Sequence, residues 1–380
     1  MAVMNRRKSR EIFLGNIGLG GDNPIRVQSM TNTKTEAVDA SIDQIKKLYD
    51  AGCEVVRLAI TSSASCEALG YIRSKLKADG LAIPLVADVH FSQKIAFEAL
   101  KYADKVRINP GNFLHSDRNL LSKARTKNIA NSFGAFVIAA KNAGKSIRIG
   151  VNQGSLDGYI IKNFGRSSLG LVESAVEFAT VAVDRGFRDM VFSFKSSYVP
   201  SMVEAYEFAC QRFDKIGFDF PMHVGVTEAG DGSLARVKSA IGIGSLLLKG
   251  IGDTIRVSIT GDPVNEIGVA YEILQSCGVR KTMVEYVACP SCGRTQFDIE
   301  KTLRAIKLAT SRFYGSGLKI AVMGCIVNGI GEMGDADFGY VGGLPGRIDL
   351  YKAGRCVKRA IDEKDAVNEL VALISFGQES

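Results

Sequence analysis

The stretch Leu85-Val-Ala-Asp-Val-His90 is followed by a helical pattern and then by Val106-Arg-Ile-Asn109. Both runs are short, apolar and β-rich, whereas the segment between them has the apolar spacing of a helix. Two buried strands joined by a helix form a βαβ unit, in which the strands pair in parallel. The stretch therefore predicts a parallel sheet covered by helices.

The same alternation extends from residue 24 to residue 262. With the two runs above it comprises eight apolar runs, the others being Ile25–Met30, Val55–Ala59, Ile147–Asn152, Met190–Lys195, His223–Glu228 and Thr254–Ile259. Eight such units in about 240 residues match a (β/α)8 barrel of the TIM type, whose usual length is about 250 residues. A doubly wound open sheet of eight parallel strands is the alternative.

The chain of 380 residues is longer than one hydrophobic core usually supports, so two domains are expected. We predict a TIM-type barrel that binds substrate over residues 1–280 and a smaller α/β domain over residues 281–380. A turn-rich stretch, residues 14–21, is predicted to form a hairpin at the barrel floor, and residues 263–278 the eighth barrel helix. The second domain is predicted to contain strands at 283–287 and 319–323 and helices at 297–313 and 364–376.

Composition narrows the range of partners. The net charge is +8, and its basic excess lies in residues 1–280, which hold 35 Lys and Arg against 28 Asp and Glu. No basic tail or aromatic-interleaved basic stripe accompanies it, so a small anionic ligand is a better prediction than nucleic acid. No apolar run reaches membrane-spanning length. Eight cysteines without a secretory segment favour a reducing cytoplasm over a disulfide framework.

Three cysteines near the C-terminus predict a metal centre. Cys289 and Cys292 form a C-x-x-C pair, and Cys325 lies in a glycine-rich stretch that runs on to Glu332. Soft thiolates indicate zinc or an iron-sulfur cluster. A structural zinc site would recruit Cys356 as a fourth thiolate, whereas Glu332, a hard oxygen donor, fits a cluster that keeps one iron available for chemistry.

Polar side chains recur toward the C-terminal ends of the apolar runs, where the active sites of TIM barrels lie. They are Arg57, Asp88, His90, Arg107, Asn109, Arg148, Asn152, Lys195, Glu228, Arg256 and Ser258. Because the five cations outnumber the two carboxylates, a phosphate-bearing ligand best balances this site. Glu228 is either a proton donor or a partner in an ion pair.

Several of these motifs resemble the 4-hydroxy-3-methylbut-2-enyl diphosphate synthase family in its compact bacterial form. The resemblance rests on Gln28-Ser-Met-Thr-Asn-Thr33, Leu85–Phe91, Arg107-Ile-Asn-Pro-Gly-Asn112, Gly225–Gly230, Gly252–Ser258, Ala288-Cys-Pro-Ser-Cys-Gly-Arg-Thr295 and Met323–Gly329 with Glu332. It extends nearly from end to end. Ile330 departs from the proline expected in the turn before Glu332, and Gln153 is a second small deviation.

The resemblance implies an iron-sulfur oxidoreductase of the non-mevalonate pathway of isoprenoid biosynthesis. It implies a [4Fe-4S] cluster on Cys289, Cys292, Cys325 and Glu332, and electrons from ferredoxin or flavodoxin. The implied substrate is 2-C-methyl-D-erythritol 2,4-cyclodiphosphate, which is opened reductively to (E)-4-hydroxy-3-methylbut-2-enyl diphosphate. Arg57, Arg107, Arg148, Lys195, Arg256 and Ser258 would grip the diphosphate, and Asp88, Asn109, Asn152 and Glu228 would face the carbon skeleton. Glu228 and Glu332 are the catalytic candidates, as proton donor and as replaceable cluster ligand.

Chain geometry adds an expectation about assembly. A final barrel helix of about fifteen residues, about 22 Å long, would return the chain to the end of the barrel opposite the active-site rim. We therefore expect a head-to-tail homodimer, which the resemblance also implies. The competing hypothesis is a non-redox phosphate-ester barrel enzyme with a structural zinc ribbon. A nucleic-acid-binding barrel is a third and weaker one.

Overall fold

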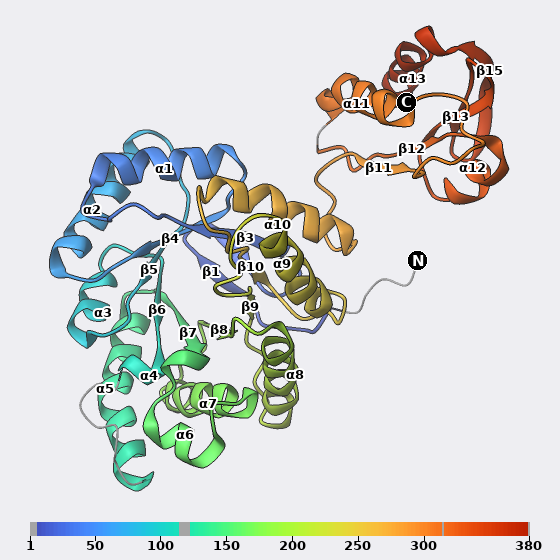
Figure 1. Cartoon of the computed structure of the whole chain (residues 1–380). Coiled ribbons are helices and arrows are strands. Elements are labelled where there is room, and N and C mark those ends of the chain that lie inside the picture. Colours follow the sequence, from blue (N-terminus) through green and yellow to red (C-terminus); the bar gives the residue numbers. More distant parts are fainter. Residues whose placement is uncertain (1–5, 114–121, 314, 379–380) are drawn as a thin grey trace. The chain divides into compact units, whose positions relative to one another are not determined.

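The computed structural model describes residues 6–113, 122–313 and 315–378 (Figure 1). Within these ranges the chain divides into two compact units, residues 1–280 and residues 281–380. The described residues include no helix that is both long enough and apolar enough to cross a membrane.

The first unit contains eight parallel strands in the order β8-β7-β6-β5-β4-β3-β10-β9. They are β3 Arg26–Met30, β4 Val55–Ala59, β5 Leu85–Asp88, β6 Lys105–Ile108, β7 Ser146–Asn152, β8 Met190–Lys195, β9 His223–Val224 and β10 Thr254–Ile255. A parallel bridge between Phe192 and Met222 joins β8 to the strand that leads into β9. The ends of the sheet thereby meet, which confirms the predicted TIM-type barrel over the open sheet.

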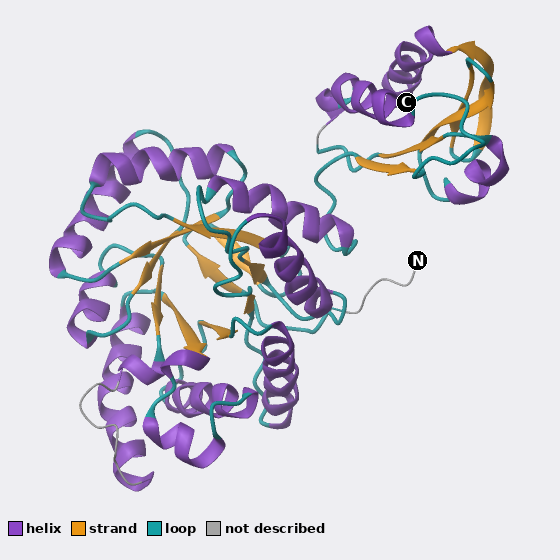
Figure 2. Ribbon diagram, in the orientation of Figure 1, coloured by secondary structure: helices purple, strands orange, loops and turns teal. Residues whose placement is uncertain are grey.

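Helices surround these strands (Figure 2). They are α1 Val38–Asp50, α2 Ser63–Ala78, α3 Gln93–Ala99, α4 Pro110–Phe113, α5 Ser122–Asn142, α6 Gly158–Phe164, α7 Ser168–Asp184, α8 Val199–Lys215, α9 Gly232–Leu247 and α10 Val264–Ser276. Several begin at side-chain caps: Ser62, Ser92, Asp157 and Ser167 each accept a hydrogen bond from a backbone N–H of the first turn. The caps set where each helix leaves its preceding loop.

A small antiparallel hairpin, β1 Ile12–Leu14 and β2 Ile17–Leu19, precedes the barrel strands. Ile12, Leu14 and Leu19 are buried, and they pack with Val55 and Val191 near the starts of barrel strands. The hairpin predicted for the barrel floor is confirmed, and it closes the end opposite the C-terminal rim.

The second unit is a five-stranded mixed sheet in the order β11-β12-β13-β14-β15. Its strands are β11 Glu285–Ala288, β12 Lys319–Met323, β13 Phe338–Leu344, β14 Arg347–Lys352 and β15 Arg355–Asp362, and its helices are α11 Ile299–Ala309, α12 Ile326–Glu332 and α13 Glu363–Gln378. Strands β11 to β13 are parallel, and β13 to β15 are antiparallel.

Alternating side chains of β12 serve both faces of this sheet. Ile320 and Val322 pack in the core that α11 and α13 cover, whereas Ala321 and Met323 pack with Met333 on the other face. Strand β12 is thus buried on both faces, which explains the continuous apolar run predicted as a strand at 319–323.

Candidate functional site

Five basic side chains of the barrel converge, and we call them the cationic cup. Arg57 lies on β4, Arg107 on β6, Arg148 on β7 and Lys195 at the end of β8, while Arg256 follows β10. All four guanidinium groups act electrostatically on the Lys195 ammonium. The structure therefore brings together the cations that the sequence placed on separate strands.

Asp88 is the carboxylate at one side of the cup. It accepts a hydrogen bond from Arg107 Nη1 at 2.9 Å, and its other oxygen lies 3.6 Å from Arg57 Nε. Burial by itself would raise the pKa of Asp88, but Arg107, Arg57 and His90 outweigh burial and hold that pKa well below its usual range. Asp88 is therefore ionised, and it neutralises one charge shared between two arginines.

Arg148 has no such partner. Its side chain is fully buried, and Nη1 donates to Gln28 Oε1 at 3.0 Å, whereas Nε and Nη2 have no hydrogen-bond partner. No carboxylate of the described residues lies within 4 Å of it. A guanidinium stays protonated in proteins, so Arg148 is a buried positive charge with unused donors. An anion in the barrel would neutralise this charge and accept hydrogen bonds from the unused donors.

Lys195 is buried among these charges at the end of β8. Burial, followed by the charges of Arg57, Arg148, Arg256 and Arg107, holds the pKa of Lys195 well below its usual range. The cup thus has more positive charge than its own carboxylates offset. A negatively charged ligand would favour the charged form of Lys195 and stabilise the whole group.

Two further titratable residues lie in the barrel: Lys105, which sequence reasoning missed, and His223, which was predicted to be a barrel-lining or core residue. Lys105 is fully buried on β6, two residues before Arg107 and so on the same face of the strand. His223, on β9, is also fully buried, with Nδ1 3.4 Å from Thr254 Oγ1 and no partner at Nε2. Burial, then Arg148, lowers the pKa of both residues, so His223 is neutral.

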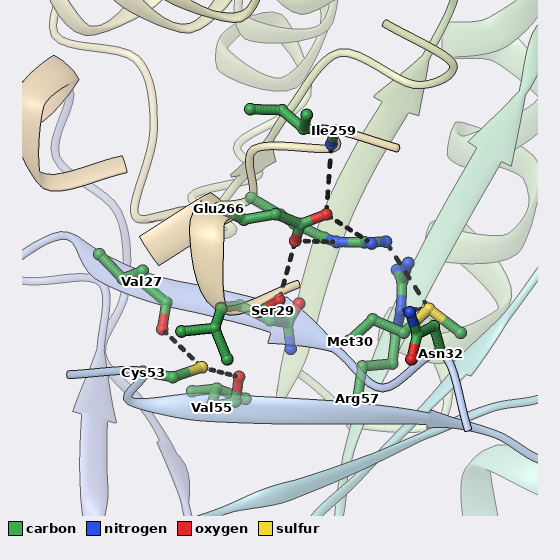
Figure 3. Close-up of polar contacts among 12 residues, drawn as sticks. Val27, Ser29, Met30, Asn32, Cys53, Val55, Arg57, Ile259 and Glu266 are labelled. Carbon is green, nitrogen blue, oxygen red and sulfur yellow. Dashed lines mark hydrogen bonds and ion pairs between the residues drawn. The ribbon is translucent and has the colours of Figure 1, made fainter. Parts of the chain in front are cut away.

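The carboxylate of Glu266, also missed, lies beside Arg256 (Figure 3). Glu266 belongs to α10 and is almost fully buried. It accepts hydrogen bonds from Ser29 Oγ at 2.8 Å and from the backbone N–H of Ile259 at 3.3 Å. It is the second carboxylate against the cup.

Glu228 and Ser258 stand in the loops that follow β9 and β10. Glu228 is exposed and has a left-handed backbone, with φ of 54°, which is costly for a residue other than glycine. Strain of this kind is common where a loop must aim a functional side chain. Ser258 is half-buried.

The two predicted asparagines make hydrogen bonds within the rim loops. Asn109 donates to Ser155 Oγ at 2.7 Å and accepts from the Gly111 N–H at 3.2 Å. Asn152 accepts from the Gly154 N–H at 2.9 Å and neighbours Lys195 in strand register. Both amides shape the rim loops, so contact of either with a carbon skeleton stays a prediction.

The cysteine segments meet at one edge of the second unit. Cys289 follows β11 and Cys325 follows the adjacent parallel strand β12. The Cys289 N–H donates to Val322 O, and the Gly324 N–H donates to Cys289 Sγ, both at 3.2 Å. A Cβ at Gly324 would collide with Thr295, whose N–H donates to Cys292 O, so this glycine admits the Cys292 loop.

The residues predicted to hold a metal centre are not drawn together into a metal site among the described residues. Cys292 is exposed, and its pKa is lowered chiefly by a hydrogen bond from the Arg294 backbone. Glu332 ends α12 and is exposed. Among the described residues no three His, Cys, Asp or Glu side chains stand close enough to hold a metal ion. Cys356 lies on β15, where its thiol donates to Lys358 O at 3.5 Å.

A TIM-type barrel that holds a buried cationic cup, followed by a small thiol-bearing α/β domain, is the class of protein that this fold and site define. The chain matches the GcpE TIM-barrel domain over residues 9–271 and the GcpE protein C-terminal domain over residues 285–376. It belongs to the GcpE family.

Curated relatives cover almost the whole chain. A protein from Prochlorococcus marinus is 48% identical over 98% of this chain and 93% of its own length. One from a Synechocystis species is 48% identical over 98% of this chain and 94% of its own length. Both are named 4-hydroxy-3-methylbut-2-en-1-yl diphosphate synthase (ferredoxin), so the predicted resemblance is confirmed.

Proposed function

We propose that this chain is an oxidoreductase that converts 2-C-methyl-D-erythritol 2,4-cyclodiphosphate to (E)-4-hydroxy-3-methylbut-2-enyl diphosphate in isoprenoid biosynthesis. Family membership supports the reaction, because relatives of 48% identity carry that synthase name. The structural observation that supports the proposal is the cationic cup, which is buried and incompletely neutralised.

The charge of the proposed substrate suits this cup. Each phosphate of a cyclic diphosphate carries one strongly acidic oxygen, so the ring is a dianion throughout the neutral range. Arg57, Arg107, Arg148, Lys195 and Arg256 would donate to its oxygens, together with Ser258. The unused Nε and Nη2 donors of Arg148 would then acquire acceptors. Asp88, Asn109 and Asn152 would border the carbon skeleton.

The overall change adds two electrons and two protons to the substrate. One carbon–oxygen bond to the diphosphate opens, one hydroxyl leaves as water, and an allylic diphosphate remains. Glu228 would supply a proton, because it lies in the loop that follows β9 at the C-terminal rim and holds a left-handed backbone conformation there, which is costly for a residue other than glycine. Ferredoxin, named for the relatives, or flavodoxin would deliver the electrons.

Cys289, Cys292, Cys325 and Glu332 would hold a [4Fe-4S] cluster. When bound, the cluster would pass electrons to the substrate one at a time. Glu332 is the weakest of these ligands, since a carboxylate oxygen is harder than a thiolate, and its exposed side chain can move away. Thiolate ligands stay reduced in the cytoplasm, which we propose as the compartment.

Anaerobic purification with iron and zinc analysis and an absorption spectrum tests the cofactor. We expect about four irons and four acid-labile sulfides per chain, and brown protein. Colourless protein with zinc, and loss of zinc on Cys356→Ser, would instead establish the zinc-ribbon alternative. Glu332→Ala should keep its iron and lose turnover of the cyclic diphosphate, whereas full activity in this variant would refute the role of Glu332.

We also propose a head-to-tail homodimer in which one subunit's cluster domain serves its partner's barrel. The support is the path of the chain after α10. Arg280 donates to the backbone oxygen of Ile25 at 2.9 Å and to Glu54 at 2.7 Å. Ile25 and Glu54 directly precede β3 and β4, so the linker leaves from the end of the barrel opposite the C-terminal rim.

A further inference from the structure

Glu266 gathers three separate segments of the barrel around one buried carboxylate. Its Oε2 accepts from Ser29 Oγ on β3, and its Oε1 accepts from the backbone N–H of Ile259, in the loop after β10. Glu266 itself stands in the first turn of α10 and is 3% exposed. Figure 3 shows this carboxylate between Ser29 and Ile259. A helix, a strand and a rim loop are thus tied at one point.

The same carboxylate fixes Arg256. Arg256 Nε donates to Oε2 and Nη2 donates to Oε1, each at 3.3 Å. A carboxylate that takes two donors of one guanidinium fixes the plane of that group as well as its position. The Nη1 group is turned away from Glu266, toward Met30 Sδ at 3.6 Å. The donors that Glu266 leaves unused therefore face the other members of the cup.

Met30 lies between two of those members. Its sulfur accepts from Arg57 Nε at 3.1 Å and from Arg256 Nη1 at 3.6 Å. A thioether is a weak, polarisable and uncharged acceptor. It therefore spaces two like charges without cancelling either of them, which a carboxylate at this point would do.

We propose that Glu266 is a positioning residue of the anion site, which sets the direction of the Arg256 guanidinium and of the backbone at Ser258 and Ile259. Met30 completes the arrangement by keeping Arg57 beside Arg256. This role rests on the proposed function, because the cyclic diphosphate is the anion toward which Arg256 is directed.

The first test is Glu266→Gln in the full-length holoenzyme. The amide keeps one oxygen acceptor and replaces the other by an NH2 group, which would face Arg256 together with either Ser29 or Ile259, all of which donate to the carboxylate here. The KM for the cyclic diphosphate should rise about tenfold, with kcat within about threefold of wild type. Glu272→Gln is the matched control, because Glu272 is an exposed glutamate of the same helix, and it should change neither value. An ion pair that only tethers α10 would lower the melting temperature and leave KM unchanged, which would overturn the proposal.

A double-mutant cycle tests whether Glu266 acts through Arg256. Arg256→Ala should raise KM, and adding Glu266→Gln should raise it no further, because the group being positioned is already gone. Multiplication of the two effects would overturn the proposal. If Glu266→Gln does not fold, Glu266→Asp takes its place, because aspartate keeps the charge and withdraws the carboxylate by one methylene. An unchanged KM in the Glu266→Asp variant also counts against the proposal.

Wild-type kinetics separate this proposal from the proposed function. Wild-type protein that does not turn over the cyclic diphosphate would refute the function itself. Wild-type turnover with an unchanged KM in folded Glu266 variants would refute the role of Glu266 alone. Met30→Leu, which removes the acceptor at nearly constant volume, should raise KM about threefold.

Discussion

At the scale of single residues, the strand face on which Lys105 lies could be predicted from the sequence, but Lys105 itself was missed. Alternation with a period of two residues places Lys105, Arg107 and Asn109 on one face of a strand. The run was predicted to begin at Val106, whereas β6 begins at Lys105, so this cation was overlooked. Glu266 gave no such signal, because an acidic residue in the first turn is ordinary for an exposed helix.

Lys105→Met should make the protein more stable at neutral pH. Burial lowers the pKa of Lys105 well below its usual value. At a pH between the pKa of the folded state and that of the unfolded state, the unfolded chain therefore binds a proton that the folded protein lacks. The free energy of unfolding therefore rises with pH until the unfolded pKa, about 10.4, is reached. Methionine should add about 1 kcal/mol or more at pH 7, and the gain should shrink toward pH 10.

Urea denaturation at pH 7, 8.5 and 9.5 measures this effect, with Lys101→Met, a change at an exposed lysine, as the control. A Lys105→Met protein that is less stable than wild type at pH 7 would contradict the prediction. It would mean that the Lys105 ammonium is well solvated or paired in the folded barrel.

Glu228→Gly should separate backbone strain from chemistry. Glycine adopts a φ of 54° without penalty, so the melting temperature should hold or rise, with about 1 kcal/mol gained. Removal of the carboxyl group should reduce kcat at least about 100-fold, the usual contribution of a general acid. Glu228→Gln, which keeps the strain, should show the same kinetic loss. Retained kcat in the glycine variant would exclude Glu228 as the proton donor.

At the scale of elements, strands with uninterrupted apolar runs were predictable and those with close backbone contacts were not. The predicted runs at 223–228 and 254–259 end early, as β9 and β10, because Gly225 packs directly against the Arg256 backbone and the chain then bends into rim loops. Strand β13 contains three glycines and was not predicted. A Cβ at Gly342 would collide with Gly324 O. Gly342 is therefore required by close packing of the backbone and not by a turn.

The floor hairpin supplies a prediction with an internal control. Leu14 is fully buried, whereas Phe13, its neighbour on β1, is 62% exposed. Leu14→Ala should lower the free energy of unfolding by about 2 to 5 kcal/mol, while Phe13→Ala should change it by about 0.5 kcal/mol or less. Chemical denaturation monitors both. Equal effects would show that β1 does not insert into the barrel end.

At the scale of the whole molecule, the sequence predicted a TIM-type barrel followed by a smaller α/β domain, and the observed architecture agrees. What it could not give is the support around the cup, because Ser29, Met30 and Glu266 meet only after the barrel closes. Contacts between residues more than 200 positions apart leave no local pattern.

Mixing two inactive variants tests the proposed assembly. Lys195→Met should disable the cup, and Cys325→Ser the cluster site. If cup and cluster act across subunits, each mixed dimer holds one intact pair, so exchange of subunits should restore about a quarter of wild-type activity. Subunit exchange, followed by size-exclusion chromatography and the activity assay, provides the measurement. Dimers that mix without regaining turnover would contradict action across subunits.

The hairpin that closes the barrel floor also limits how substrate and product can enter and leave the barrel. With the floor closed, substrate and product share the opening at the C-terminal rim. The allylic diphosphate must therefore leave past the same guanidinium groups that bind the cyclic diphosphate. Opening the ring frees an additional acidic oxygen, so the departing molecule is held more tightly by charge than the arriving one. We therefore expect product release, rather than bond cleavage, to limit the rate of turnover.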